Sequence, residues 1–346
     1  MIQSSGTCIY AGCVDPQAIF ALTRELIDIE SITLNEVAVG DFLFIRLGAL
    51  GFAAEKMPVK AGRFNIYAHC GKPADLVFST HIDTVPPFFP SREDDEKIYG
   101  RGACDTKGII AAMLAAALRL KKDGLSIGLL LVVGEERDSA GAKVANRHVP
   151  DPPRFLINGE PTENRVAIAS KGALRVEIIA RGTMAHSAYP HLGESAIDKL
   201  LDALDRVRNL HLPSNPDVGP CTMNIGVIEG GRAPNVISDY AKAQLLFRTV
   251  GPSADVIEQI KAAAGPAVET TAVLDIPFVK LRTFADLPTF VAAYTTDIPA
   301  LTNWGEPILF GPGSIHVAHT DGEYIEKQQQ LAAVDIYERM ARQLLA

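Results

Sequence analysis

The chain has 346 residues, of which 47% are apolar and 21% are charged, and its formal net charge is -8. This length favours two domains, and the acidic charge without any dense basic run argues against nucleic-acid binding. No apolar stretch reaches membrane-spanning length, no signal peptide is recognisable, and five scattered cysteines fit a reducing compartment. We therefore expect a cytoplasmic protein whose leader, up to about Cys13, is poorly ordered.

The first half of the chain alternates helical and strand-like patterns. Apolar residues recur with helical period after Asp15, which can cap a helix that starts at Pro16. The expected helices are residues 16–29, 36–50, 106–122 and 139–147, and the expected strands are residues 64–70, 76–81, 127–133 and 155–157. This alternation predicts an α/β fold with a mixed, mostly parallel sheet flanked by helices.

The order of elements changes from about residue 173. The expected order is strand, helix, strand, strand, helix, strand, over residues 173–180, 194–209, 223–229, 240–249, 253–264 and 271–278. That order is typical of a ferredoxin-like α+β unit. A helix over residues 287–294, a short strand near Ile308 and a helix over residues 328–345 follow. We therefore predict an inserted domain, residues 173–282, within a larger domain of residues 1–172 and 283–346.

Acidic and imidazole side chains follow the expected strands. His81 and Asp83 share one face of a strand end, a spacing that suits a metal ligand and a carboxylate that orients its ring. Asp105 follows a glycine-rich turn and is a candidate partner for His81. Adjacent Glu135 and Glu136 point oppositely on an extended backbone, so one can bind metal while the other reaches a water molecule. A polar strand end and two solvated glutamates remain the alternatives.

Two further candidates lie later in the chain. Glu160 follows another expected strand, where it is either a ligand or an ordinary turn residue. His319 is a candidate imidazole ligand, and His316 is the alternative to it. Because open α/β sheets bind ligands beyond the carboxyl ends of their strands, these residues predict a site there. Carboxylates and imidazoles without a thiolate suit zinc or cobalt. Cys104 adjoins Asp105, but its neighbouring position points it away, so we expect it only to pack.

Seven short motifs occur in the order found in a known enzyme family. They are HID at His81, GRGACDTKG around Asp105, GEE at Glu135, GEPT at Glu160, GTMAHSA at His186, GGRAPNVI at Asn235 and AHTDGE at His319. This set resembles the dinuclear zinc amidohydrolases that include acetylornithine deacetylase, succinyl-diaminopimelate desuccinylase, aminoacylase and carboxypeptidase G. The resemblance covers residues 76–323, and IYGRGACDTKG is most similar to the acetylornithine and acetyl-lysine deacetylase branch.

The resemblance implies a zinc-exopeptidase-like catalytic domain that binds two zinc ions, with cobalt as a possible substitute. It also implies a role for each matching residue. His81 and Glu160 would bind one ion, Glu136 and His319 would bind the other, and Asp105 would bridge them and precede a cis peptide bond. Glu135 would be the general base, and Asp83 would hydrogen-bond to the ring of His81.

The resemblance further implies a substrate site and a homodimer formed through the inserted domain. His186 would enter the active site of the partner subunit, and Asn235 and Arg248 would hold the substrate carboxylate. Gly313 would make a backbone contact to substrate. Two features depart from the family: Leu246 stands where an acidic residue often precedes the arginine, and the chain is short. A loop histidine and a surface arginine are the alternatives for His186 and Arg248.

The function that the resemblance implies is metal-dependent hydrolysis of the amide bond of an N-acyl amino acid. N-acetylornithine or acetyl-lysine deacetylation in amino-acid biosynthesis, including arginine biosynthesis, is the expected reaction. Desuccinylation of succinyl-diaminopimelate and cleavage of peptides by a dipeptidase or carboxypeptidase are alternatives. A catalytically silent homologue that binds metal is an alternative of a different class.

Overall fold

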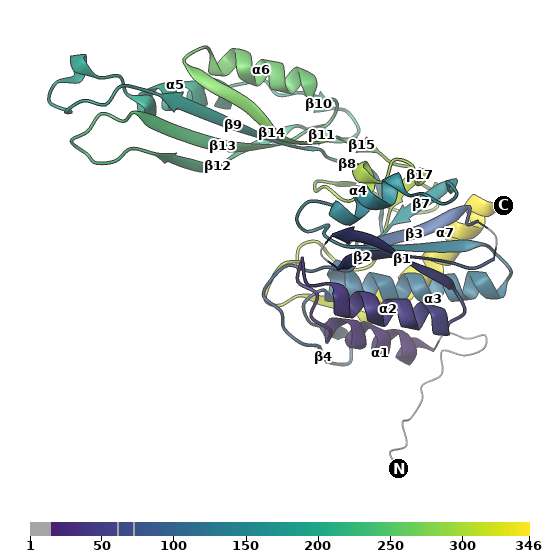
Figure 1. The fold of residues 1–346 in the computed structure, drawn as a ribbon. Helices are drawn as coiled ribbons and strands as arrows, with labels where there is room; N and C mark the ends of the chain where they lie inside the picture. Colours follow the sequence, from purple (N-terminus) through teal and green to yellow (C-terminus); the bar gives the residue numbers. More distant parts are fainter. Residues whose placement is uncertain (1–14, 61, 72) are drawn as a thin grey trace. The chain divides into compact units, whose positions relative to one another are not determined.

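The computed structural model describes residues 15–60, 62–71 and 73–346, so the expected leader, with Cys8 and Cys13, lies outside the described residues. The chain divides into two compact units (Figure 1). The larger unit comprises the residues up to Ala167, Leu281–Phe290 and Thr296–Ala346, and the smaller unit comprises Ile168–Lys280 and Val291–Thr295. None of the helices in the described part of the chain has the length and hydrophobicity that crossing a membrane requires.

A six-stranded sheet forms the centre of the larger unit. Its strands, in spatial order, are β1 (Ala53–Lys60), β2 (Arg63–His69), β6 (Ile127–Val132), β3 (Leu76–His81), β7 (Phe155–Asn158) and β17 (Glu306–Leu309). β6, β3, β7 and β17 pair in parallel, whereas β2 pairs antiparallel with both β6 and β1. The predicted mixed, mostly parallel sheet is therefore confirmed, and β1 is a strand that the sequence patterns did not indicate.

Helices cover both faces of this sheet, which explains the continuous apolar runs of its central strands. Leu76 and Phe78 of β3 pack into the core under one set of helices, and Val77 between them packs on the opposite face. The first face carries α1 (Pro16–Ile27), α2 (Val37–Ala49), α3 (Gly108–Lys122) and α7 (Lys327–Leu345), and the second carries α4 (Ala140–Arg147) (Figure 1).

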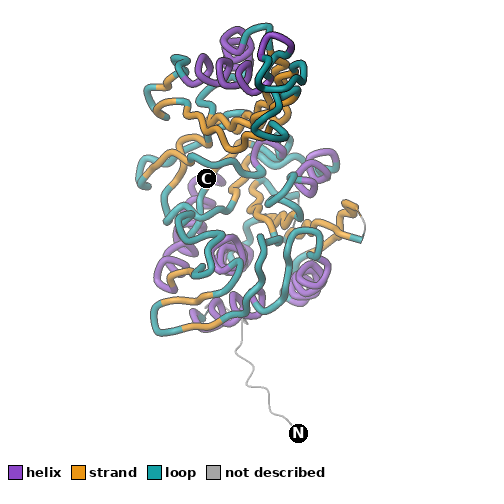
Figure 2. The backbone as a smooth tube through the Cα atoms, turned by 90° about the vertical axis from the view of Figure 1, so that its left-hand side faces the viewer, coloured by secondary structure: helices purple, strands orange, loops and turns teal. Residues whose placement is uncertain are grey.

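The smaller unit is an antiparallel sheet with helices on one side. Along the chain its elements are β9 (Ala173–Arg181), α5 (Ala196–Arg208), β12 (Thr222–Gly230), β13 (Tyr240–Arg248), α6 (Ala254–Ala264) and β14 (Val268–Ile276). The strand order is β12-β13-β9-β14, with every pair antiparallel. Figure 2 shows the two helices on one side of these strands, where they bury a separate core. The predicted ferredoxin-like unit is therefore confirmed.

The remaining strands are short. They form the groups β18 (Tyr324–Glu326), β5 (Lys97–Tyr99) and β4 (Arg92–Glu93); β10 (Ser214–Asn215) and β11 (Gly219–Pro220); and β15 (Val279–Lys280), β8 (Val166–Ser170) and β16 (Thr289–Ala292). Single turns of helix are η1 (Ala103–Lys107), η2 (Pro190–Leu192) and η3 (Ile298–Ala300).

One predicted element is wrong. Residues 287–294 were expected to be a helix, but the structure has the strand β16 there. Its backbone lies next to β8 in a three-stranded sheet. Over so few residues a helical and an extended apolar pattern look alike, and the tertiary partner decides between them.

Candidate metal centre

Three neighbouring strands of the parallel sheet end at the candidate centre. β3 ends at His81, the loop after β6 carries Glu135 and Glu136, and the loop after β7 carries Glu160. β3 lies between β6 and β7, with His81 paired to Val132. Because the carboxyl ends of parallel strands meet at one edge, residues distant in sequence are brought together there.

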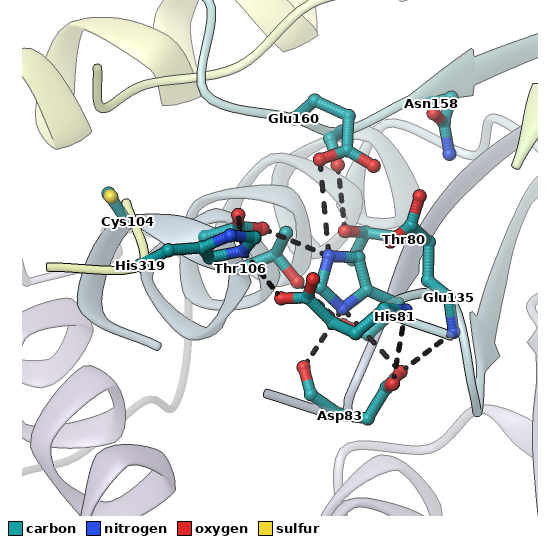
Figure 3. Close-up of polar contacts among 12 residues, drawn as sticks. Thr80, His81, Asp83, Cys104, Thr106, Glu135, Asn158, Glu160 and His319 are labelled. Atoms are coloured by element: carbon teal, nitrogen blue, oxygen red, sulfur yellow. Dashed lines mark hydrogen bonds and ion pairs between the residues drawn. The ribbon is translucent and has the colours of Figure 1, made fainter. Parts of the chain in front are cut away.

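Asp105 lies between two imidazole rings, with one carboxylate oxygen towards each. Its Oδ1 is 3.0 Å from Nε2 of His81, and its Oδ2 is 3.3 Å from Nε2 of His319. Nε2 of His319 is also 2.9 Å from Oε1 of Glu136, and Nε2 of His81 is 3.9 Å from Oε2 of Glu160. Figure 3 shows Glu135, Glu160 and His319 around the ring of His81. The five residues expected as ligands therefore form one cluster.

The imidazoles of His81 and His319 cannot neutralise all the carboxylates of the cluster. Burial raises the pKa of Glu135 and of Glu160 well above the ordinary glutamate range. Asp105 and Glu136 raise the pKa of His319 to about 10. Burial by itself lowers the pKa of His81, but Asp105 and Asp83 more than offset it and raise the pKa. A bound cation would supply the missing charge.

The segment that carries Asp105 has an unusual backbone. Gly102 adopts a left-handed conformation with φ of 86°, and a Cβ there would lie 2.8 Å from the side chain of Thr84. The peptide bond between Asp105 and Thr106 is cis, which confirms that expectation. The hydroxyl of Thr106 donates to the carbonyl of His81 at 2.6 Å, so this segment is tied directly to the end of β3. Cys104 is buried beside Ser314, as its predicted packing role requires.

Asp83 contacts the cluster through its backbone carbonyl as well as its carboxylate. Nδ1 of His81 lies 2.9 Å from the backbone oxygen of Asp83 but 3.6 Å from its carboxylate, so the closer partner of the ring is the carbonyl. The buried carboxylate also accepts the N–H groups of Gly134 at 2.9 Å, Glu135 at 3.1 Å and Glu136 at 3.3 Å. Asp83 therefore holds the loop of the two glutamates as well as the ring.

A family model described as peptidase family M20/M25/M40 matches residues 77–343, which include this whole cluster. The chain belongs to this family. It is therefore a hydrolase of a metallopeptidase family. A peptidase M20 domain-containing protein of Schizosaccharomyces pombe is 37% identical over 342 residues, which cover 93% of this chain and 84% of that protein. A probable carboxypeptidase of Aspergillus fumigatus is 34% identical over 386 residues, with 96% and 88% covered.

The fold is also that of a solved peptidase structure. The crystal structure of a tripeptidase from Staphylococcus aureus superposes with a TM-score of 0.81 and covers 96% of this chain and 100% of that one. Its sequence is 22% identical, so this likeness establishes the fold of the M20 chain and not its substrate.

The residues expected to bind substrate are partly in the smaller unit of this M20 protein. His186 is exposed, and its Nδ1 accepts the N–H of Ala188 at 3.1 Å. Asn235 lies beside it, because the carbonyl of Asn235 accepts the N–H of Ser187 at 3.0 Å. Arg248 ends β13 half-buried, and within the described ranges its guanidinium has no hydrogen-bond or ion-pair partner. Burial lowers the pKa of Arg248, although an arginine remains charged at any ordinary pH.

Gly313 lies in the larger unit and is already engaged within the chain. Its N–H donates to the side chain of Gln329, and its carbonyl accepts the N–H of Glu163 at 2.8 Å. A backbone contact from Gly313 to substrate would therefore use the second lone pair of the carbonyl or displace Gln329. The alternative histidine, His316, is exposed and has no contact with the cluster among the described residues.

The sequence patterns missed one buried group that contacts the cluster. Glu323 is buried, and its Oε1 accepts the backbone N–H of Asp105 at 3.2 Å. Its position as the last letter of the AHTDGE motif was the available signal. The motif alone gave it no role, because a glutamate after a glycine turn is ordinarily solvated.

Proposed function

We propose that this M20 hydrolase cleaves the amide bond of a small substrate whose amine-side residue carries a free carboxylate, as a carboxypeptidase does. The observation that carries the proposal is the position of Asp105 between His81 and His319, with one oxygen towards each ring. A carboxylate shared in this way is suited to hold two metal ions side by side. The relatives named as probable carboxypeptidases support this choice of substrate.

The donors fit a pair of divalent ions. Oε1 of Glu160 is buried and has no hydrogen-bond partner within the described chain, so it is available as a ligand atom. Donor atoms of His81, Asp105 and Glu136 lie within 4.8 Å of one another. We assign His81 and Glu160 to one ion, Glu136 and His319 to the other, and Asp105 to both. Nitrogen and oxygen donors alone suit zinc, with cobalt as a substitute; such ions polarise a carbonyl and acidify a bound water.

Glu135 is the proposed general base. Its backbone N–H is held by Asp83, and its carboxylate has no hydrogen-bond or ion-pair partner in the described part of the chain. Glu135 takes a proton from water as the bond between the water oxygen and the carbonyl carbon forms. It then gives that proton to the amine nitrogen as the carbon–nitrogen bond breaks.

Residues of the smaller unit would recognise the substrate. The unpartnered guanidinium of Arg248 can bind a carboxylate through two parallel hydrogen bonds, and Asn235 would assist it. His186 would donate a hydrogen bond to the oxygen on which negative charge develops. With Leu246 two residues before Arg248, the arginine has no adjacent carboxylate on that face of β13 to compete with the substrate.

Deacetylation of N-acetylornithine is the second candidate, favoured by the phrase IYGRGACDTKG around Asp105. This reaction would place the enzyme in cytoplasmic arginine biosynthesis. It uses the same cluster, because the acetylated amine also belongs to an amino acid with a free carboxylate. The two candidates differ in the acyl group and in the side chain of the released amino acid, and none of the roles assigned above distinguishes either.

A substrate panel tests the proposal. Short peptides and N-acyl amino acids, each with a free or an amidated carboxyl end, would be incubated with and without chelator, and released amine measured. We expect cleavage only with a free carboxyl end, loss with chelator and recovery with zinc. Cleavage of amidated substrates would contradict the role of Arg248. A metal-loaded protein inactive on the whole panel would be a catalytically silent homologue.

We also propose that residues 173–282 act as a lid and dimerisation domain, with His186 serving the partner subunit. Mixing inactive His186→Ala subunits with inactive Glu135→Gln subunits is then expected to restore activity. A mixed dimer has one site with both residues intact, so random exchange gives roughly a quarter of all sites in that state. Activity would be measured after subunit exchange is verified by a tag on one variant. Exchange without recovery would show that His186 acts in its own chain or has no catalytic role.

A further inference from the structure

A buried ion pair lies directly against the segment that carries Asp105. Nη1 of Arg101 donates to Oε2 of Glu323 at 2.7 Å, and both side chains are 1% exposed. Arg101 also donates from Nε to the carbonyl of Pro87 at 3.2 Å. The Glu323 backbone is fixed too, because Tyr324 pairs with Tyr99 in the short sheet of β18 and β5. The carboxylate of Glu323 is therefore held in one orientation.

The two oxygens of Glu323 have different partners. Oε2 faces Arg101, whereas Oε1 accepts the backbone N–H groups of Cys104 and Asp105, each at 3.2 Å. Both N–H groups belong to η1, in which the φ and ψ angles of Asp105 and Thr106 are not helical. A carboxylate can accept from a guanidinium and two amides at once, because it offers acceptors only.

The same short loop also supplies His319, four residues before Glu323. One end of the loop therefore places an imidazole 3.3 Å from the carboxylate of Asp105, and the other end binds the N–H of Asp105. From the opposite side, Thr106 ties the segment to His81. Side chain and backbone of Asp105 are thus positioned relative to both imidazoles by direct hydrogen bonds.

We infer that Glu323 is a positioning residue for the metal centre, which sets Asp105 between the two ions by holding its backbone. The inference rests on the proposed dinuclear centre. A buried pair that only stabilised the fold would not need to contact Asp105, and such pairs are often no better for stability than apolar residues of similar size. Groups that orient metal ligands typically change metal affinity 10–100-fold when they are lost.

The test is Glu323→Gln in the full chain. A glutamine amide has one acceptor and one donor end, so it cannot accept from Arg101 and from the two backbone amides together. We expect both zinc ions to bind about 10–100-fold more weakly, measured by competition with a chromophoric chelator. The visible spectrum of the cobalt-loaded protein would report the changed ligand geometry independently of activity.

A matched control is Glu36→Gln, which breaks a second buried glutamate–arginine pair of the larger unit. Glu36 binds Arg63 and contacts no residue of the Asp105 segment, so its loss should lower stability and leave zinc affinity unchanged. Glu323→Gln leaves the guanidinium of Arg101 without a charged partner among the described residues. Replacing Arg101 and Glu323 together by methionine removes that charge as well as the acceptor of the Asp105 N–H. That double variant should melt close to the wild type and still bind zinc weakly.

Wild-type zinc affinity in the double variant, or equal loss in Glu36→Gln, would overturn the role of Glu323. Metal binding by the wild-type protein tests the proposed centre separately from the role of Glu323. A wild-type protein that binds no zinc or cobalt would overturn the proposed centre together with this role. A wild type that binds two ions and a Glu323→Gln variant that binds them equally well would overturn the role alone.

Discussion

Glu135→Gln is expected to keep its metal and to lower turnover by about 10²–10⁴-fold, the usual size of a general-base contribution. The substitution preserves the size of the side chain and the backbone N–H that donates to Asp83, so the loop should keep its conformation. What it removes is the ability to accept and return a proton. The measurement pairs steady-state kinetics with elemental analysis of the same sample.

The adjacent residue provides the control for that experiment. Glu136 lies 2.9 Å from His319 and is assigned as a ligand, so Glu136→Gln should lose metal as well as activity. The two variants make the same chemical change one residue apart, on the same loop. Turnover near the wild-type rate in metal-loaded Glu135→Gln would exclude Glu135 from the mechanism.

Asp105→Ala is expected to lose both metal ions and all metal-dependent activity. Among the described residues, Asp105 alone directs an oxygen at each of the two imidazoles, at 3.0 Å and 3.3 Å, so no other ligand there can replace it at both positions. Metal content would be measured by elemental analysis after dialysis, and the fold by circular dichroism. The loss should be larger than in a variant of a ligand to one ion, such as Glu160→Ala.

Cys104→Ala is the control for the Asp105 variant. It changes a buried side chain in the same segment, yet its sulfur points to Ser314 and Glu323 and not to the imidazoles. Metal content should therefore stay close to that of the wild type. Two ions per chain in folded Asp105→Ala would show that this carboxylate does not bridge them.

Most residues of the candidate centre could be named from the sequence because they follow an apolar strand or a glycine-rich turn. His81, Glu136 and Glu160 end or follow three aliphatic runs, and parallel strands bring such ends to one edge of a sheet. Asp105 was a candidate because it follows a glycine-rich turn, and His319 because its loop adds an imidazole; the resemblance of their motifs then implied their roles. The role of each remains a proposal that the variants above test.

The sequence by itself determined the type of sheet, the ferredoxin-like order of the smaller unit and the composition of the cluster. These depend on apolar period and chain order, which are local properties. Only the tertiary structure decided that residues 289–292 pair as a strand and that Asp83 gathers the N–H groups of residues 134–136. It also decided that Glu323 is buried against Arg101 and holds Asp105. Each of these features depends on hydrogen bonds between segments that are distant in the chain. Buried polar groups bind whichever partner the fold brings near them.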